Sequence, residues 1–202
     1  MSEQNKNNNE NNNNNKNNRK KREFILNKDV DAQSVENILM EIIEINRIDS
    51  EKEKEDENYV REPIKVIVNS YGGVCHDGIA LAGVIDSSET PVYTYIYGKA
   101  MSMGFYIFAS GHRRFAHPMA TFMFHDTAFG IHAKTQGVEE YLKQAISLRT
   151  RMNEFLLSVT NLPKEKMEEA IKYQIDWYLT PHEAIEYGLA DELIKSTRNR
   201  NK

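Results

Sequence analysis

Apolar and polar positions follow two different periods along this chain. Residues 64–68 form an apolar run interrupted only by Lys65, and residues 92–97 form a second run of the same kind. Both are predicted to be buried strands. Residues 34–47 and 137–160 instead repeat their apolar positions at helical spacing, which predicts two amphipathic helices. Shorter patterns of the same two kinds predict strands at 23–26, around Phe115 and at 121–125, and helices at 78–85, 102–109 and 164–173.

The predicted helix ends carry recognisable capping residues. Asp31 or Ser34 can cap the first long helix, because a short oxygen-bearing side chain there accepts a free backbone N–H. Near the C-terminus, Thr180 is followed by Pro181 and Glu183, the arrangement of a capping box with proline in the first turn. Gly188 is predicted to end that helix.

Strands, turns and helices alternate along the chain, which favours an α/β domain with a largely parallel sheet. We expect this domain to occupy residues 23–195. Residues 1–22 form an asparagine-rich basic arm with no apolar residue between Met1 and Phe24; it is predicted to be disordered because it has nothing to bury. Residues 196–202 are predicted to be a polar tail. The charged stretch 49–61 lacks apolar anchors and is expected to be a frayed helix end or an exposed loop.

Composition narrows the classes of function. The net charge is −4, with acids and bases mixed, so a dedicated nucleic-acid binder with a basic face is not expected; the basic residues 19–22 are read as part of a solvated tail. Cys75 is the only cysteine, which excludes an intramolecular disulfide and favours a reducing compartment. We find neither a signal-peptide pattern nor an apolar run of roughly 18 residues. A cytoplasmic protein without a membrane partner is therefore expected.

Two glycine-bearing turns are the first candidates for chemistry. Each follows a predicted strand and leads into a predicted helix: one contains Gly72 and Gly73, and the other places Ser102 between Gly98 and Gly104. Backbone N–H groups at such a turn can stabilise a developing oxyanion, and a serine on a tight turn has its hydroxyl presented to solvent. Either turn alone is also a common structural device.

Four segments, in this order, resemble the signature motifs of the ClpP serine peptidases, and the resemblance runs from about Arg22 to Leu193. The segments are Ile-Val-Asn-Ser-Tyr-Gly-Gly-Val at 67–74, Gly-Lys-Ala-Met-Ser-Met-Gly at 98–104, Phe-Met-Phe-His at 122–125, and Ile-Asp-Trp-Tyr-Leu-Thr-Pro-His-Glu-Ala at 175–184 with Tyr-Gly-Leu-Ala-Asp at 187–191. The resemblance implies the ClpP/crotonase-like fold of repeated β-β-α units, with residues 137–160 as its long handle helix.

Carried over by position, the resemblance makes Ser102 the nucleophile, His125 the general base and Asp176 the residue that orients the histidine. The backbone N–H groups of Gly72 and Met103 match the oxyanion positions of the family. The implied activity is serine endopeptidase cleavage of unfolded polypeptides inside an oligomeric chamber, with no cofactor and no metal. The implied partners are a polypeptide substrate, further copies of the chain in a ring that can stack into a double ring, and an ATP-driven AAA+ unfoldase.

Less specific interpretations stand beside this one. Most of the six histidines are expected to be surface or loop residues, and Cys75 is expected to pack as a small apolar group rather than to react. Two other functions are weighed: a catalytically silent ring or scaffold subunit of the ClpP type, which has no need of an intact Ser102, His125 and Asp176, and a crotonase-like acyl-CoA enzyme, which shares the two oxyanion turns.

The chain also departs from the family pattern at several positions. Tyr71 stands where the family has proline, and Ile175 stands where it often has an arginine that is linked to contacts between rings. Asp126 and Thr127 follow the histidine in place of glutamine and proline, and Gly130 is what remains of a glycine-rich strand. These changes lie beside the predicted handle helix, so they bear on the double ring more than on the fold.

Overall fold

The computed structural model describes residues 20–130 and 134–197. Most of the predicted arm (1–22) and of the predicted polar tail (196–202) lies outside these ranges, so both remain predictions. Arg22, the last residue of the predicted arm, is described and lies at the start of the first strand.

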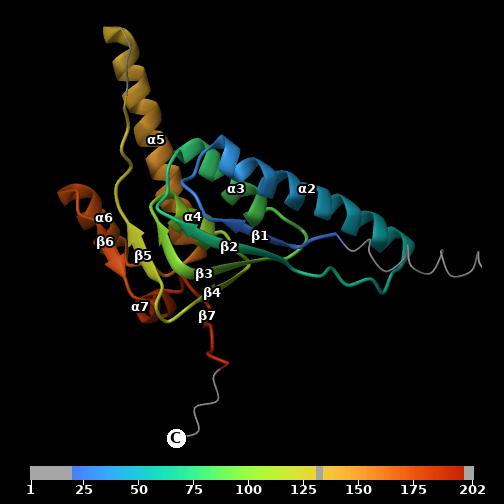
Figure 1. Ribbon diagram of the computed structural model, residues 1–202. Coiled ribbons are helices and arrows are strands. Elements are labelled where there is room, and N and C mark those ends of the chain that lie inside the picture. Colours follow the sequence, from blue (N-terminus) through green and yellow to red (C-terminus); the bar gives the residue numbers. More distant parts are fainter. Residues whose placement is uncertain (1–19, 131–133, 198–202) are drawn as a thin grey trace, which may run out of the picture.

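A mostly parallel sheet of seven strands forms the centre of the described residues (Figure 1). Its main path runs β1-β2-β3-β4-β7 with every pair parallel; β5 pairs parallel with β3, and β6 pairs antiparallel with β5. This confirms the predicted α/β class. The strands are β1 (Glu23–Leu26), β2 (Ile64–Ser70), β3 (Val92–Met101), β4 (Arg113–Ala116), β5 (Thr121–Phe124), β6 (Trp177–Leu179) and β7 (Glu192–Leu193).

The sheet divides into two branches at β3. Residues 93–96 of β3 pair with β4, whereas residues 99–101 pair with β5. The strand is therefore longer than the predicted 92–97, because pairing with β5 keeps the chain extended through Gly98 to Met101. The second branch thus ends β3 beside β5, directly before Ser102, and β6 pairs with β5.

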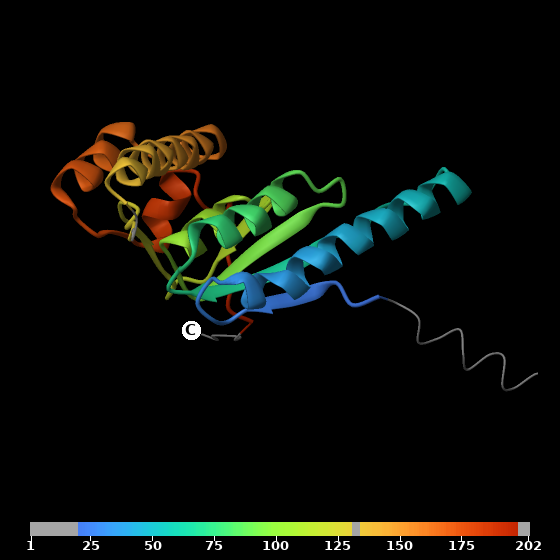
Figure 2. The ribbon, with the colours of Figure 1, turned by 90° about the horizontal axis from the view of Figure 1, so that it is seen from above.

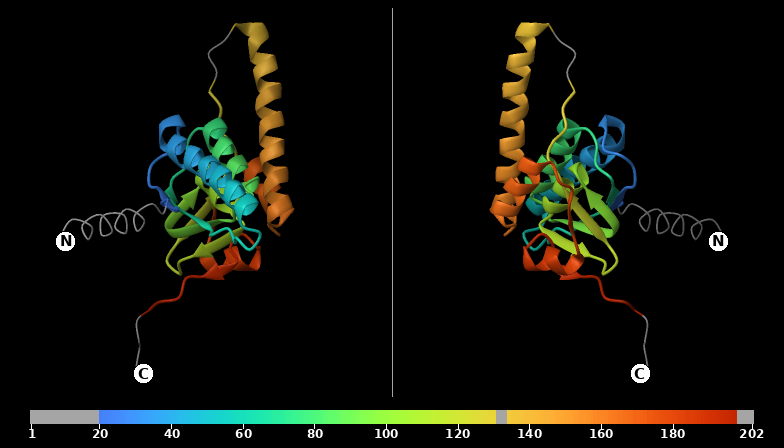
Figure 3. Two further views of the ribbon diagram at one scale, coloured as in Figure 1. Left: turned by 90° about the vertical axis from the view of Figure 1, so that its right-hand side faces the viewer. Right: turned by 90° about the vertical axis from the view of Figure 1, so that its left-hand side faces the viewer.

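Helices cover one face of the main sheet. Figures 1 and 2 show α2 and α3 side by side on this face, and Figure 3 shows α5 rising away from the sheet, with its N-terminal end farthest from the domain. All seven residues of α4 are buried, and Phe105 and Phe108 both lie against the ring of Phe122. The helices are α2 (Ala32–Glu55), α3 (Cys75–Asp86), α4 (Met103–Ala109), α5 (Thr135–Val159), α6 (Lys164–Tyr173) and α7 (Pro181–Glu186).

The predicted caps are confirmed at both helices. Asp31 is the N-cap of α2: its side chain accepts the Ser34 N–H, and the Ser34 hydroxyl in turn accepts the Asp31 N–H. Thr180 and Glu183 form the second capping box, at α7. Gly188 follows the end of α7 with a φ of 60°, a left-handed conformation that glycine adopts without the penalty of a Cβ.

Residues 51–58 are exposed, as predicted for the stretch 49–61, but the start of this stretch is regular helix with a buried residue. Helix α2 continues through this stretch to Glu55, and Asp49 is completely buried. Its carboxylate accepts hydrogen bonds from the Arg22 guanidinium (2.9 Å), the Tyr59 hydroxyl (2.7 Å) and the Thr90 hydroxyl (2.8 Å). Burial by itself raises the pKa of Asp49, but these donors outweigh it and hold the pKa below its ordinary value. The anchor here is a buried carboxylate, which hydrophobic periodicity cannot detect.

Candidate active site

Ser102 occupies a sharp turn between β3 and α4. It is the N-cap of α4 and has φ 49° and ψ −122°, a conformation that costs a non-glycine residue of order 1–3 kcal/mol. Its N–H donates to the Met123 carbonyl at 2.9 Å, which continues the pairing of β3 with β5. The buried helix that follows and the strand that precedes hold the turn in place, so the side chain projects from it.

His125 lies at the end of β5, beside this turn. Because Met101 is opposite Met123 in the parallel pair, the residues that directly follow the two strands end close together. The His125 Nε2 is 2.7 Å from the Ser102 Oγ, and its side chain is 34% exposed. At this distance a neutral imidazole can take the proton of the serine hydroxyl.

Asp176 is brought to the other side of the imidazole by strand register. Phe124 is opposite Trp177 in the antiparallel pair of β5 and β6, so the next opposed pair is His125 and Asp176. The Asp176 Oδ1 is 3.5 Å from the His125 Nδ1, and its side chain is 53% exposed. The structure therefore brings the three predicted residues into one line of contacts, with a short serine–histidine contact and a longer histidine–aspartate contact.

The glycine turn after β2 packs directly against Ser102. Gly72 has a φ of 103°, and a Cβ built on it would lie 2.6 Å from the Ser102 Cβ and 2.8 Å from the Met103 backbone nitrogen. The two N–H groups predicted to form the oxyanion hole are therefore neighbours. The Gly72 N–H donates to the Ser70 hydroxyl at 3.1 Å, so any other acceptor has to compete with that hydroxyl for this donor.

An ion pair that no local sequence pattern indicates connects the histidine segment to α5. Asp126, which directly follows His125, accepts the Thr127 N–H at 2.8 Å and pairs with Arg149 at 3.2 Å. The sequence shows the departure from the family pattern at Asp126. It does not show that Arg149 is the partner of Asp126, because the two residues are 23 positions apart and meet only through the placement of α5.

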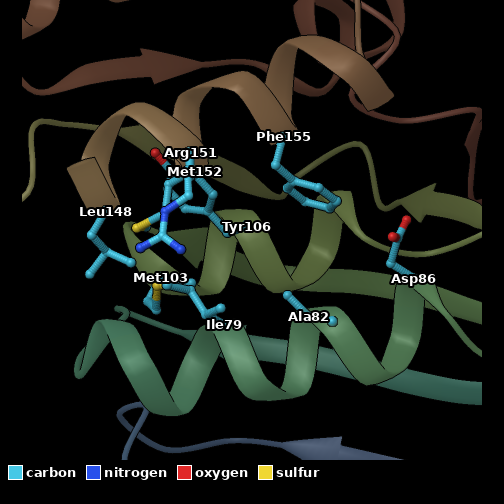
Figure 4. Close-up of a pocket in the computed structure, with 10 residues that line it drawn as sticks. Ile79, Ala82, Asp86, Met103, Tyr106, Leu148, Arg151, Met152 and Phe155 are labelled. Carbon is cyan, nitrogen blue, oxygen red and sulfur yellow. The ribbon is translucent and has the colours of Figure 1, made fainter.

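A cavity of about 200 Å³ lies between α3, α4 and α5 (Figure 4). Met103, the residue after Ser102, forms part of its wall. Most other lining residues are apolar, among them Ile79, Leu148 and Phe155, while Asp86 and Arg151 are its charged members. The residue that follows the predicted nucleophile thus contributes to a mostly apolar cavity, although Ser102 and His125 do not line it.

The remaining candidates have no comparable setting. Cys75 is partly buried against the core, and burial raises the pKa of its thiol, which fits the expected packing role. His112 and His117 accept backbone N–H groups in loops, and His132 lies outside the described residues. In the described part of the chain, no group of three or more His, Cys, Asp or Glu side chains could hold a metal ion, and none of the described helices is long and apolar enough to cross a membrane.

Comparison with known proteins identifies the family and agrees with the fold. The family model described as Clp protease matches residues 6–197. A curated relative, the ATP-dependent Clp protease proteolytic subunit of Deinococcus radiodurans, is 28% identical over 179 residues, which cover 88% of this chain and 82% of the relative. Among solved structures, a mutant of ClpP1 from Listeria monocytogenes superposes with a TM-score of 0.71 at 21% identity, over 87% of this chain and 92% of that one. The last similarity confirms the ClpP/crotonase-like fold.

Proposed function

The chain belongs to the Clp protease family, and we propose that it is a serine endopeptidase that hydrolyses peptide bonds of unfolded polypeptides with Ser102, His125 and Asp176. The observation that carries the proposal is the 2.7 Å contact between the Ser102 Oγ and the His125 Nε2, with the Asp176 carboxylate on the far side of the imidazole. Family membership favours a peptidase over the acyl-CoA enzyme that the fold alone would allow.

In this proposal Ser102 attacks the carbonyl carbon of the scissile bond while His125 accepts its proton. Asp176 keeps the Nδ1 proton of His125 on its own side and stabilises the imidazolium that forms. The Gly72 and Met103 N–H groups stabilise the oxyanion of the tetrahedral intermediate. His125 then protonates the leaving amine, which departs and leaves an acyl-enzyme. A water molecule, activated by the same histidine, hydrolyses the acyl-enzyme and regenerates Ser102.

We further propose that the active form is an oligomeric ring enclosing a chamber, formed in the cytoplasm from copies of this chain. Helix α5 supports this, because its protruding half carries exposed apolar residues at helical spacing: Val138, Tyr141, Leu142 and Ile146. Such a stripe is typical of a helix that associates with another copy. The family relationship also makes an ATP-driven unfoldase the proposed partner that delivers polypeptide.

The assembly is tested by light scattering after size-exclusion chromatography. Leu142→Glu places a charge within the stripe and is expected to reduce the oligomer. Lys143→Glu changes charge on the neighbouring exposed position of the same helix and serves as its control. Equal masses for both variants and the unmodified chain would remove α5 from the interface.

The chemistry is tested by labelling the assembled protein with a fluorophosphonate probe and mapping the modified residue by mass spectrometry. We expect modification of Ser102, its loss in Ser102→Ala, and a large reduction in His125→Ala. Ser87→Ala, which removes an exposed hydroxyl bonded to the Gly83 carbonyl, is the matched control and should label normally. An assembled protein that does not label would be a silent subunit instead of a peptidase.

A further inference from the structure

Arg151 differs from the other arginines of the described residues in having no carboxylate partner there. Each of the other six pairs with at least one acidic side chain: Arg22, Arg47, Arg61, Arg113, Arg114 and Arg149. The contact seen for Arg151 is a long hydrogen bond of 3.5 Å from its Nε to the Ser147 carbonyl, one turn earlier in α5. Its two terminal amino groups therefore remain available for an acceptor.

Arg151 borders two hollows whose walls include residues from the segments that carry the proposed site. Its side chain borders the cavity of about 200 Å³ next to Met103 and also a smaller hollow of about 80 Å³ lined by His76 and Phe129. Met103 follows Ser102, His76 follows the Gly72 turn by four residues, and Phe129 follows His125 by four. Three of the four segments that build the proposed site thus contribute residues to these two hollows, and Arg151 borders both.

Arg151 is exposed, and most of the residues that line the larger cavity with it are apolar. In Figure 4 the guanidinium extends from α5 toward α3, at the end of the cavity where Met103 and Leu148 lie, while Asp86 lies at the opposite end. Arg151 and Asp86 do not form an ion pair, although both line this cavity. A planar cation above an apolar wall binds a carboxylate through two parallel N–H donors, which distinguishes a carboxylate from an amide of the same shape.

We propose that Arg151 is a specificity-determining residue that binds a substrate carboxylate close to the scissile bond, so that the enzyme prefers peptides with an acidic group there. The inference rests on the proposed peptidase function and adds to it a preferred class of substrate. The carboxylate can belong to a glutamate or aspartate side chain or to the C-terminus of a short peptide, and both are bound through the same chemistry.

The test uses the full-length, assembled protein and internally quenched peptides with both ends blocked. One glutamate is moved through the three positions on each side of the scissile bond, and each peptide is compared with its glutamine counterpart; mass spectrometry confirms the cleavage position. We expect kcat/KM to favour glutamate by roughly fivefold at one position, the effect of a partly exposed ion pair. A second set compares free and amidated C-termini and identifies the source of the carboxylate.

Two substitutions separate the charge from the shape of the side chain. In Arg151→Gln the glutamate-to-glutamine ratio should fall to about one, whereas Arg151→Lys should keep part of the preference. Asp86→Asn is the matched control at the other end of the cavity; it removes a carboxylate that repels the acidic group, so the ratio should stay as high or rise.

The outcomes distinguish this inference from the proposed function. A protein that hydrolyses the peptides and labels at Ser102, but shows ratios near one at every position and for both kinds of C-terminus, overturns the role of Arg151 alone. A preference for glutamate that persists in Arg151→Gln overturns it as well. Failure of hydrolysis and of labelling would instead overturn the peptidase function.

Discussion

Replacing Gly72 with alanine tests how closely the glycine turn and the nucleophile depend on each other. The new Cβ would lie 2.6 Å from the Ser102 Cβ, 2.8 Å from the Met101 carbonyl oxygen and 2.8 Å from the Met103 nitrogen. Two of these three atoms belong to the backbone, so no flexible side chain can move aside. The φ of 103° at this position is also unfavourable for any residue with a Cβ.

The steric contact and the backbone conformation together give the size of the expected loss of stability. Holding alanine in the unfavourable backbone region costs of order 1–3 kcal/mol, and forcing an extra methyl group against packed atoms costs about 1–3 kcal/mol more. We therefore expect Gly72→Ala to lower the free energy of unfolding by roughly 2–6 kcal/mol, a large part of the 5–15 kcal/mol typical of a domain. The strain is relieved most easily by moving the Ser102 turn, which lengthens its 2.7 Å contact with His125.

Two measurements on one sample check this expectation. Denaturant unfolding measures the loss of stability, and the rate of fluorophosphonate labelling measures the alignment of the nucleophile, which we expect to fall about a hundredfold, since displacements near 1 Å have that effect. Gly83→Ala is the control for unfolding, because a Cβ there meets nothing within 4 Å and should stabilise α3 by about 0.5–1 kcal/mol. A Gly72→Ala protein with unchanged stability and unchanged labelling would refute the proposed packing of the turn.

Three further predictions concern the carboxylates. Asp176→Asn should lower kcat about a hundredfold with little change in unfolding, because this half-exposed side chain is predicted to act on His125 alone; equal kcat values would remove it from the mechanism. Arg149→Ala and Asp126→Asn should each slow fluorophosphonate labelling roughly fivefold, because their ion pair is predicted to position His125. A double-mutant cycle should show that the two effects do not add. Additive losses would mean that the pair does not position the histidine. The pKa of Asp49 is held below its ordinary value, so its contribution to stability is present at neutral pH and is lost as the pH falls below about 4. Asp49→Asn should therefore cost about 3 kcal/mol of unfolding free energy at pH 7 and less at pH 3. Denaturant titrations that show the same difference between variant and unmodified chain at both pH values would contradict this.

Much of the fold could be predicted because its signals are local. The hydrophobic period of α2, the capping box at Thr180 and the glycine at 188 each depend on residues within a few positions of one another, and the structure confirms each of them. The extension of β3 to Met101 and the burial of Asp49 depend on partners far away in the chain. No pattern within 64–101 indicates that β5 will lie beside the end of β3, and none within 49–61 indicates that a carboxylate there meets Arg22.

The difference between local signals and long-range pairing also explains what could be predicted of the site. Ser102 and Gly72 each lie on a turn that is visible in the sequence, yet their close approach follows from the pairing of β2 with β3. Asp126 stands out in the sequence only as a departure from a motif. Nothing in the sequence marks Arg149 or Arg151 as part of a site, because a cation on an amphipathic helix is ordinarily a solvated residue.

The placement of Asp176 shows how much of the proposed chemistry depends on this non-local pairing. Neither a recognisable motif nor a spacing of 51 residues from His125 fixes a distance between their side chains. The distance is set by the three-residue strand β6, whose antiparallel register with β5 makes position 176 the next partner of position 125. Gln174, in a left-handed conformation at the end of α6, turns the chain so that this strand can begin.

The aspartate is therefore held by the short strand that follows it and by the turn that precedes it, and it stays half-exposed because β6 lies at the edge of the sheet. The short serine–histidine contact and the longer histidine–aspartate contact thus share one cause: Ser102 and His125 follow the ends of two neighbouring parallel strands, whereas Asp176 approaches His125 from the edge strand.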